Sequence, residues 1–558
     1  MSKHLIRKHL GEMPLLQATI KHLRFREILV HYVKTHGNET LPAVDTLLLM
    51  VCNIACGRQP LYELPHWSGQ LEHRALSTLP DDIGDRPFTD DRFGRALDKL
   101  FAADRASLVI DIVLRVIEAT GVDLSQIHND STSVKTTGTM AAKSATGLQF
   151  KRGHSKDHRP DLKQIVYNLT ISADGAIPLH YKAYPGNRTD DTVHIEIWNT
   201  LCQITGREDF LYVADCKVCT RKQLAHIVRY GGRVVTLMPE TWKDAGLFKQ
   251  AQRQSPKKKH RLWRRLRANS HTDYETFYRL AGTHTTVQGH YPLHWIYSSE
   301  KNKRDWAARE KRLKRAEADL TQLMVKLNKR QLKTQPQIEK RVAALLHRHG
   351  VSSYFHIDIG QVEEQIDKQI GRGRPTKQTR YQTIVNTIYT LSWRRNDAAL
   401  KREKHIDGLF PILCTDKTLS AKQALQAYKY QPHLEKRFYQ LKTAHLAAPT
   451  LFKKVERVEA MMLLFFLALI LQAVIERDVR RQMSAAKINA LSIYPEHRLA
   501  YHPTTAKIFE RFHEISTYQI KRNGLVVEEY RDELNGVQKE ILGLLRMTEQ
   551  DYWSGVNG

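Results

Sequence analysis

The sequence predicts an α/β protein in which helices flank a mixed β-sheet, an α+β insertion interrupts the sheet, and a helical N-terminal domain precedes it. Three observations predict this class. Apolar residues follow a helical period up to about residue 115, they alternate with polar residues from about 118 onward, and a dense basic segment begins at residue 257. The 558 residues are enough for three to four domains of about 150 residues each.

Charge is the dominant feature of the composition. The chain carries 87 Lys+Arg against 59 Asp+Glu, which gives a formal net charge of +28 and a pI near 9.7. A hydrophobic fraction of 41% and a charged fraction of 26% are typical of a folded globular protein and exclude a disordered chain. A compact body this basic favours nucleic acid as its partner, because each neutralised phosphate releases counterions and strengthens binding.

Other features argue against a membrane or an oxidising compartment. The long apolar run Ala460–Ile475 contains Gln472 and is flanked by Glu459 and Glu476. It is shorter than the roughly 20 residues of a bilayer span, so it predicts a buried core helix. The basic N-terminus lacks the apolar segment of a signal peptide, and six cysteines are too few for a disulfide scaffold. We therefore expect a cytoplasmic protein with no membrane partner.

Residues 1–117 are predicted to form the helical N-terminal domain. Leu15–Val33 and Ala43–Ala55 carry apolar residues at helical spacing, and the turn-rich stretches Pro65–Gly69 and Leu79–Pro87 interrupt the pattern. DNA reading and dimerisation or packing both remain open as roles for this domain, because no helix-turn-helix signature distinguishes them.

Residues 118–240 are predicted to form the first part of the sheet. Asp174-Gly175 predicts a tight hairpin turn between two alternating strands. The complete predicted order is strand, strand, strand, helix, strand, helix, strand, with elements near 122–130, 165–171, 177–183, 191–204, 210–214, 220–228 and 233–238. A three-strand meander followed by alternating helices and strands predicts a mixed sheet covered by helices, and this is the order of the RNase H-like fold.

Two acids end strands of this predicted sheet. Asp130 follows the first strand and Asp215 follows the fourth, and the RNase H-like fold places those two strands side by side. An aspartate at a strand end is usually a turn former or a helix cap, so neither residue alone indicates chemistry. Together they predict a pair of neighbouring carboxylates.

Residues 241–419 are predicted to form an insertion domain with a basic run, a helical arm over 301–347 and a small β-sheet. The basic run is either a solvated face or a phosphate contact; its candidate DNA-binding residues are Lys257, Lys258, Lys259, Arg264 and Arg265. Arg372-Gly-Arg374-Pro resembles the core of an AT-hook, whose arginines enter a narrow minor groove, and a flexible basic turn is the alternative interpretation.

Residues 420–480 are predicted to complete the core with a functional helix, and residues 481–558 to form a helical tail. Tyr428, Gln431, Glu435 and Lys442 are spaced by three, four and seven positions, so at about 100° per residue they share one helix face. Pro432 predicts that the helix begins or kinks beside Gln431.

Here the sequence resembles the DDE transposases of bacterial insertion sequences, in the superfamily with a Tyr-(2)-Arg-(3)-Glu-(6)-Lys signature. Tyr428, Glu435 and Lys442 match the signature, and Gln431 departs from it in place of the Arg. The resemblance covers roughly residues 10 to 480. It extends to Asp130-Ser-Thr132, Gly153–Gln164, Pro185-Gly-Asn187, Val213-Ala-Asp215 and Arg372-Gly-Arg-Pro375.

The resemblance implies cut-and-paste transposition on an RNase H-like core. Phosphodiester hydrolysis and strand transfer both use two divalent ions, and Mg²⁺ prefers a few carboxylates plus water and phosphate oxygens. The implied catalytic and metal-binding residues are Asp130, which bridges two Mg²⁺ ions, and Asp215 and Glu435, which each complete one site; Mn²⁺ can substitute.

The resemblance also implies DNA contacts and partners. Tyr428 and Lys442 would contact the backbone near the scissile phosphate. In the family, the Arg that corresponds to Gln431 holds DNA phosphate, and here His433, Lys436 and Arg437 are candidates to compensate. The implied partners are double-stranded inverted-repeat ends, target DNA and a second copy of the chain in a homodimer on DNA, associated with the bacterial nucleoid.

Two alternatives remain open at this point. One is an RNase H-fold nuclease that cuts DNA without joining it. The other is a catalytically impaired, transposase-derived DNA-binding protein, which the departure at Gln431 keeps open.

Overall fold

The structure is a computed structural model, and it divides into two compact units. Unit 1 comprises Met1–Thr236 and Leu425–Gly558, and unit 2 comprises Leu237–Ala424. The structure describes residues 3–35, 39, 41–57, 59–76, 89–136, 144, 146–153, 161–188, 193–268, 273–329, 332–445, 452, 454–494, 496, 498–523, 525–554 and 556.

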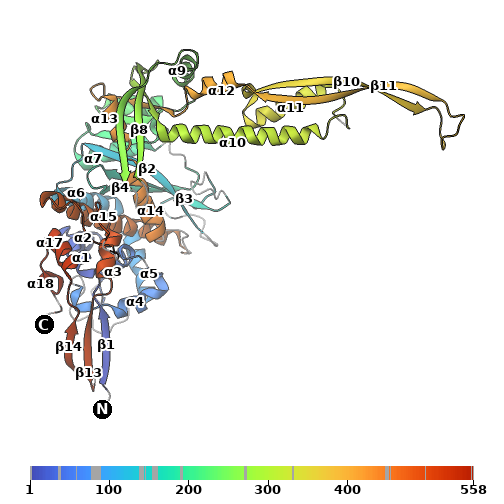
Figure 1. The fold of residues 1–558 in the computed structure, drawn as a ribbon. Helices are drawn as coiled ribbons and strands as arrows, with labels where there is room; N and C mark the ends of the chain where they lie inside the picture. The colour runs from blue at the N-terminus through green and yellow to red at the C-terminus, as the bar shows by residue number, and fades with distance from the viewer. Residues whose placement is uncertain are drawn as a thin grey trace. The chain divides into compact units, whose positions relative to one another are not determined.

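Unit 1 contains the predicted mixed sheet, in the strand order β4-β3-β2-β5-β6. Strands β2, β3 and β4 are labelled in Figure 1. Strand β3 pairs antiparallel with both β2 and β4, whereas β5 pairs parallel with β2 and β6. The five strands are β2 (Gln126–Lys135), β3 (Gln164–Ser172), β4 (Pro178–Pro185), β5 (Leu211–Ala214) and β6 (Arg233–Leu237). The mixed α/β class is therefore confirmed.

The hairpin predicted at Asp174-Gly175 joins β3 to β4. Gly175 has φ +78°, which favours glycine, and a Cβ at this position would come within 2.8 Å of the Arg477 side chain. Arg477 in turn donates to both carboxylate oxygens of Asp174, at 3.0 and 2.6 Å. The turn residues are thus selected both by backbone conformation and by a packed ion pair.

Strand β3 differs from the sequence expectation. Its alternating pattern predicts one buried face, but all nine residues are buried. Helix α14 (Pro432–Tyr439) contacts β3, and the Tyr167 ring stacks on the Tyr181 ring at 5.5 Å, which itself lies 4.8 Å from Phe466 of α15 (Val455–Ala485). Helices α14 and α15, from a distant part of the chain, pack against this strand and its neighbour β4, so periodicity alone could not show its burial.

The apolar run predicted as a core helix is the central part of α15, which contacts α3, α5 and β4. Among the described residues, α15 alone is long and apolar enough to cross a membrane, but 94% of its most apolar window is buried inside the protein. The other helices of unit 1 are α1 (Met13–His22), α2 (Phe25–Tyr32), α3 (Ala43–Ala55), α4 (Leu64–Gln70), α5 (Asp90–Ala102), α6 (Arg105–Thr120), α7 (His194–Thr205), α8 (Arg221–Arg229), α16 (Thr505–Phe512), α17 (Gly536–Leu544) and α18 (Glu549–Tyr552). Helix α13 (Ala421–Tyr428) lies at the boundary with unit 2.

Both ends of the chain contain strands that the sequence does not predict. Strand β1 (Lys3–His9) pairs antiparallel with β13 (Ser516–Arg522), which pairs with β14 (Leu525–Arg531). The first strand finds its partner about 500 residues away, so no local pattern could reveal the pairing. Residues 1–117 consequently belong to the same compact unit as the mixed sheet.

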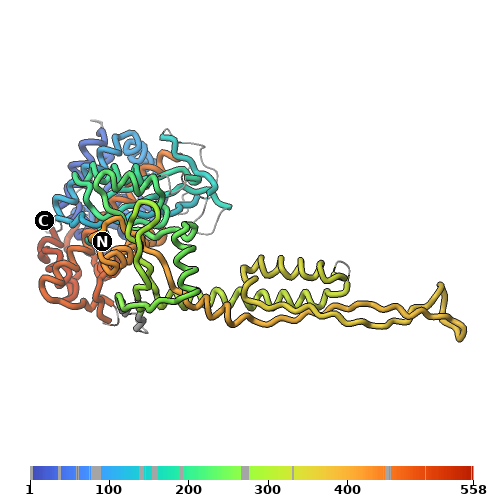
Figure 2. The backbone as a smooth tube through the Cα atoms, turned by 90° about the horizontal axis from the view of Figure 1, so that it is seen from above, coloured from blue at the N-terminus to red at the C-terminus, as the bar shows by residue number. Residues whose placement is uncertain are grey.

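Unit 2 contains an antiparallel run of strands in the order β12-β9-β8-β7 and a separate two-stranded hairpin, β10-β11. The predicted basic run leads into the edge strand β7. The elements are α9 (Lys243–Gln254), β7 (His260–Ala268), β8 (Asp273–Thr285), β9 (Pro292–Ser298), α10 (Ser299–Met324), α11 (Gln335–His349), β10 (Phe355–Gln369), β11 (Tyr381–Arg395), α12 (Asp397–Lys404) and β12 (Leu409–Cys414). Helices α10 and α11 lie along the base of the hairpin in both ribbon and tube views (Figure 2).

Candidate active site

Asp130 and Asp215 lie beside each other at two neighbouring parallel strands of unit 1. The register of β2 and β5 pairs Asn129 with Ala214; Asp130 is the next residue within β2, and Asp215 directly follows the end of β5. Both side chains are half-buried. Asp130 lies within β2 and not at its end as predicted, because β2 continues along β3 after β5 has stopped.

Local hydrogen bonds hold each aspartate in place. The Asp215 carboxylate accepts from the backbone N–H of Lys217 at 2.9 Å and caps a 3₁₀ turn, while its backbone carbonyl accepts from the Thr236 hydroxyl at 2.7 Å. The Asp130 carboxylate accepts from the backbone N–H of Ser131 at 2.7 Å. These bonds occupy part of each carboxylate and orient it, which suits a metal ligand as well as a cap.

Tyr428, at the end of α13, lies close to the acids. Burial raises the pKa of its hydroxyl, and the negative charges of Asp215, Asp130 and Glu435 raise it further. The pKa of Tyr212 on β5 is raised in the same way, by burial first and then by neighbours that include Asp215 and Asp130. Both hydroxyls therefore stay protonated at neutral pH and can only interact with an anion as hydrogen-bond donors.

Gln431 docks helix α14 onto β2. Its side chain is 7% exposed, its Nε2 donates to the Asn129 carbonyl at 3.2 Å, and its Oε1 lies 2.9 Å from Nδ1 of His128. An amide oxygen only accepts, so Nδ1 of His128 carries the proton, and Nε2 of His128 accepts from the Gln126 amide at 2.8 Å. Burial lowers the pKa of His128 to about 4, so the ring is neutral at pH 7.

This arrangement differs from the predicted role of Gln431 in DNA binding. The side-chain amide of Gln431 makes its hydrogen bonds inside the protein, to Asn129, which directly precedes the candidate Asp130, and to His128. The neutral His128 is fully buried. A glutamine at this position therefore has a structural explanation, because a guanidinium here would offer no acceptor to the ring of His128. Sequence analysis missed His128 as the partner, although it lies directly before Asn129-Asp130.

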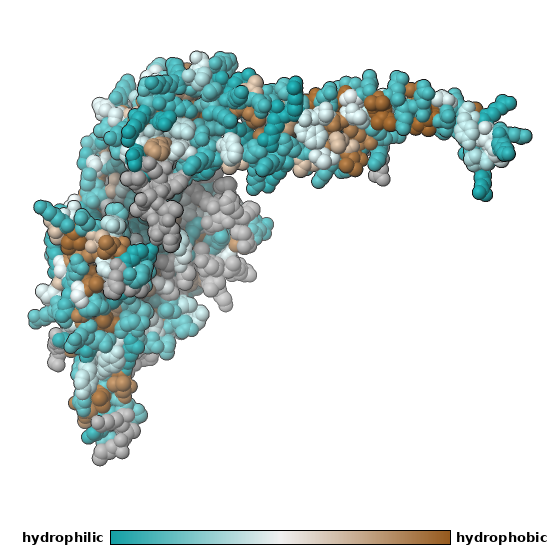
Figure 3. All heavy atoms as spheres, in the orientation of Figure 1, coloured by the Kyte–Doolittle hydropathy of each residue, from teal (hydrophilic) through white to brown (hydrophobic). Residues whose placement is uncertain are grey.

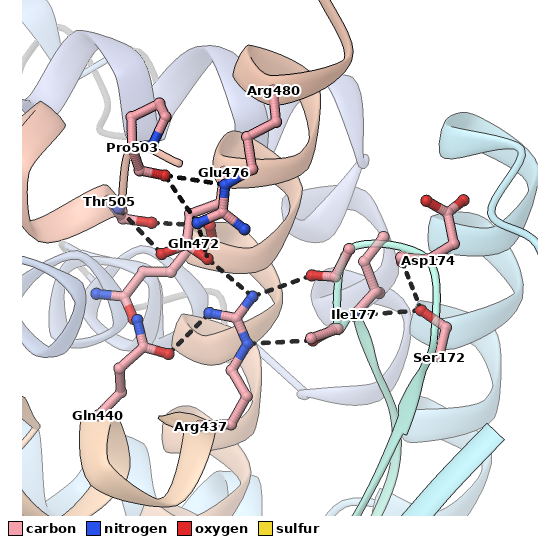
Figure 4. A network of polar contacts seen from close by, with 12 residues as sticks. Ser172, Asp174, Ile177, Arg437, Gln440, Gln472, Glu476, Arg480, Pro503 and Thr505 are labelled. Carbon is pink, nitrogen blue, oxygen red and sulfur yellow. Dashed lines mark hydrogen bonds and ion pairs between the residues drawn. The ribbon is translucent and has the colours of Figure 1, made fainter. Parts of the chain in front are cut away.

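Arg437 also differs from its predicted role as a DNA contact. The side chain is 3% exposed, and it donates to the carbonyls of Gly175 and Ala176 in the β3–β4 turn, each at 3.1 Å. Its guanidinium pairs with Glu476 of α15 at 3.1 Å and donates to the Gln440 amide oxygen at 2.7 Å (Figure 4). All of these hydrogen bonds and the ion pair are made within unit 1, so Arg437 positions α14 between the sheet and α15.

Glu476 is ionised in this network. Burial acts to raise the pKa of its carboxyl, but the charges of Arg437 and Arg480 and the hydrogen bonds from Thr505 outweigh burial and lower the pKa. Figure 4 shows the guanidinium of Arg437 between Glu476 and the β3–β4 turn. The helix that carries Glu435 is thus fixed at its first turn by Gln431 and one turn later by Arg437.

Glu435 and Lys436 occupy the exposed side of α14. Lys442 lies half-buried in the π-helical turn Gln440–Ala444 that continues the helix, and π-helical turns are frequent at functional sites. Searched over the described residues, no group of three or more His, Cys, Asp or Glu side chains is close enough together to hold a metal ion. The structure brings Asp130 and Asp215 together and presents Glu435 on the helix docked beside them.

The basic residues predicted in unit 2 divide into two groups. Lys257, Lys258 and Arg264 are exposed, and Arg265 is half-buried with its guanidinium 5.9 Å from the Trp263 ring. Lys259 instead turns inward: its Nζ donates to the His405 carbonyl at 3.1 Å and lies 4.5 Å from the Tyr297 ring, and burial lowers its pKa. Lys259 thus has a structural role within unit 2, whereas the exposed residues remain candidates for phosphate contact.

Two of the other predicted motifs are described in part. Gly153 and Gly186 mark a close approach of two backbone segments, since a Cβ on Gly153 would lie 2.0 Å from the Gly186 carbonyl oxygen. A Cβ on Gly186 would lie 2.0 Å from the Gln164 carbonyl oxygen. The segment 154–160 between these motifs lies outside the described residues, so the loop predicted there is not described.

A cavity of about 990 Å³ in unit 1 lies away from this site. Arg105, His180, Lys182, Arg188 and Glu459 are among the residues that line it, whereas none of the three candidate acids does. We therefore assign the candidate active site by the acids and not by cavity size.

Comparison with known proteins adds little to this geometry. A family described as "Domain of unknown function (DUF4277)" matches residues 5–114. Among solved structures, the chain is similar to piggyBac transposase in the "Cryo-EM structure of piggyBac transposase synaptic complex with hairpin DNA (SNHP)", with a TM-score of 0.38, 8% sequence identity and coverage of 89% of this chain and 79% of that chain. No curated protein matches the chain. Likeness at this level carries no conclusion about function, which rests on the residues described above.

Proposed function

We propose that this chain is a DNA transposase that excises an insertion sequence and joins its ends to target DNA. The observation that carries the proposal is the placement of Asp130 and Asp215 directly after a paired position of two parallel strands, with the Glu435 helix docked on the same strand. Paired carboxylates at this edge, combined with the Tyr428–Lys442 motif, are what the resemblance to DDE transposases with an RNase H-like core leads us to expect.

The three candidate acids are of the chemical kind that magnesium prefers as ligands. Two half-buried aspartates and one exposed glutamate supply oxygen ligands without enclosing the ion, and Mg²⁺ prefers a few carboxylates with water and phosphate oxygens. Asp130, Asp215 and Glu435 would hold two such ions, with Mn²⁺ as a substitute. When bound, such ions activate a water or 3′-hydroxyl and stabilise the charge of the pentavalent phosphate.

The surrounding residues bind and orient DNA in this proposal. The Tyr428 hydroxyl, kept protonated by burial and by the nearby carboxylates, donates a hydrogen bond to a phosphate oxygen. Lys442 and the exposed Lys436 supply cations on the same helical segment. A net charge of +28 attracts DNA to the protein, and the local acids then restrict productive binding to the metal-loaded state.

Transposition joins two element ends, so we propose that two copies of the chain act as a homodimer on paired inverted-repeat DNA. Residues 1–117 and the exposed cations Lys257, Lys258 and Arg264 are candidates to recognise those ends. The protein would act in the bacterial cytoplasm, associated with the nucleoid.

The test is a cleavage assay on duplexes that contain the element ends with flanking DNA, in Mg²⁺. Wild type should cut at the element boundary, and Asp130→Asn should reduce cutting by at least about a thousandfold, because one bridging carboxylate is lost. Glu208→Gln is the matched control, since it removes the same charge at an exposed position close before β5. Equal cutting by wild type and Asp130→Asn would contradict the proposal.

Two further readouts separate the alternatives. Joining of a pre-cleaved end to target DNA identifies a transposase, whereas cutting without joining identifies a nuclease. Tight, salt-sensitive binding with no cutting in Mg²⁺ or Mn²⁺ identifies a non-catalytic DNA-binding protein.

A further inference from the structure

The hairpin of unit 2 is unusually long and regular. Strands β10 and β11 each have 15 residues and pair without a bulge from Phe355↔Arg395 to Gln369↔Tyr381. At about 3.4 Å per residue, such a hairpin spans about 50 Å. Register irregularities bend and twist a strand pair, so their absence here favours a straight, stiff arm.

The base of the hairpin is anchored, and its far half is not. Phe355 and Leu391 belong to a buried cluster with α10 and α11. Arg395 forms ion pairs with Glu310 at 3.0 Å and Glu317 at 2.7 Å, both on α10. Beyond Gln361, every residue of β10 up to Lys368 is exposed, so the far half of the arm extends past the helices (Figure 2).

Charge is segregated along the arm. The shaft, which we define as residues 357–370 and 381–393, carries four acids (Asp358, Glu363, Glu364, Asp367) and one lysine (Lys368). The tip, residues 371–380, carries four cations and no acid: Arg372, Arg374, Lys377 and Arg380. Apolar side chains lie along the shaft, and the far end is hydrophilic (Figure 3). Phosphates would be repelled by the shaft and attracted by the tip, so contact with a polyanion is confined to the tip.

The loop at the tip contains two glycines, and hydrogen bonds within the hairpin fix its conformation. Gly371 and Gly373 flank Arg372 with φ +103° and +136°, a region that favours glycine, and a Cβ on either would meet nothing within 4 Å. The backbone N–H of Ile370 donates to the Arg380 carbonyl at 2.9 Å and closes the loop. The Gln369 amide donates to the Gly373 carbonyl at 3.0 Å. Glycine is required here by backbone conformation and not by packing. The side chains of Arg372 and Arg374 are both exposed.

A second local turn completes the tip. The backbone N–H of Thr376 donates to the Thr379 hydroxyl at 2.7 Å, and the backbone N–H of Thr379 donates to the Thr376 carbonyl at 3.0 Å. These bonds need no partner outside the tip, so the loop is organised before it meets a ligand. Preorganisation of this kind lowers the entropy lost on binding.

From these features we infer that the arm tip binds duplex DNA by inserting Arg372 and Arg374 into an A·T-rich minor groove. The minor groove is only about 6 Å wide, and its electrostatic potential is most negative where A·T tracts narrow it. Such a groove can accept two arginine side chains from a narrow loop that contains glycines. A two-stranded ribbon can also enter the wider major groove. The acidic shaft would then lie between the phosphate backbones on both sides of the groove, which would repel it. The inference deepens the proposed function, on which it rests, by assigning a DNA contact to the tip of the arm.

The test measures binding of the full-length protein to three short duplexes that lack element-end sequence. One contains A·T pairs at its centre, one G·C pairs, and one inosine·C pairs, which resemble A·T in the minor groove and G·C in the major groove because inosine lacks the N2 amino group. The expected result is equal affinity for the A·T and inosine·C duplexes, each at least about fivefold above the G·C duplex.

Two variants assign that preference to the tip. The double variant Arg372→Lys, Arg374→Lys keeps the charge but loses the planar guanidinium, so the preference should disappear. The matched control Lys377→Ala should weaken binding to all three duplexes equally and lower the salt dependence by about one phosphate contact. Because all three residues are exposed, neither change disturbs a packed core.

The outcomes are distinct. Binding that favours A·T over inosine·C indicates major-groove reading and overturns the inference, as does equal binding to all three duplexes or a preference that survives in the double variant. Those results leave the proposed function standing, because element-end cleavage is measured separately. Failure to bind any of the three duplexes would overturn the inference as well, while the proposed function is still judged by the separate element-end cleavage assay.

Discussion

Replacement of Gln431 by alanine tests how the candidate site is assembled. The side chain is 7% exposed and makes two hydrogen bonds to β2, one with Nδ1 of His128 and one to the Asn129 carbonyl. Loss of a hydrogen bond costs about 0.5–1.5 kcal/mol, and a buried donor left without an acceptor costs about 1–3 kcal/mol. Because Nδ1 of the fully buried His128 becomes such a donor, we expect Gln431→Ala to lower the free energy of unfolding by about 2–4 kcal/mol.

The assay is equilibrium unfolding in urea, followed by circular dichroism. Gln426→Ala is the matched control, since Gln426 is an exposed glutamine on the preceding helix α13, and its replacement should change the free energy by no more than about 0.5 kcal/mol. Gln431→Arg, which introduces the residue of the Tyr-Arg-Glu-Lys signature, should destabilise at least as much as Gln431→Ala because it offers no acceptor to His128. Equal unfolding midpoints for Gln431→Ala and Gln426→Ala would refute the reasoning, as would a Gln431→Arg variant with full stability and higher DNA affinity.

Three further predictions concern charge. Arg437→Met should lower the free energy of unfolding by about 3–5 kcal/mol, measured by urea unfolding, because it removes a guanidinium from the buried Glu476; a loss below about 1 kcal/mol would show that Arg480 suffices. Burial lowers the pKa of His128 and of His180 to about 4, so the unfolded chain binds more protons, and stability that is complete above about pH 6.5 should be lost as the pH falls towards 4, by up to about 3 kcal/mol per histidine. Unfolding midpoints that stay constant between pH 7 and pH 4.5 would contradict this. Asp215→Asn and chelation of divalent ions should each abolish DNA cleavage while DNA binding, measured by fluorescence anisotropy, is retained; cleavage in the presence of chelator would exclude metal chemistry.

Local patterns in the sequence were sufficient for much of unit 1. The change from helical to alternating period predicts the order of strands and helices along the chain, and Asp174-Gly175 predicts the hairpin turn. The apolar run in α15 predicts its burial, because no solvated face remains. The adjacency of Asp130 and Asp215 follows from the parallel pairing of β2 with β5, although Asp130 lies within its strand and only Asp215 follows the end of one.

Tertiary structure decided which polar residues serve the interior. Gln431 and Arg437 lie in a motif that predicts DNA contacts, yet both face strands and a helix of the same unit. Helical spacing shows which residues share a face, but it does not show what that face packs against. Only the docking of α14 between the sheet and α15 separates these two residues from Glu435 and Lys436 on the exposed side.

The same distinction applies to contacts between distant segments. The pairing of β1 with β13 joins the two ends of the chain, and the reach of the β10–β11 arm depends on a register of 15 residue pairs. Sequence alone determined that this chain is a basic α/β protein with an aspartate at the predicted end of each of two strands, because charge, period and turn chemistry act over a few residues. Burial and partner choice depend on what the rest of the chain brings to each residue, and they emerged only in the tertiary structure.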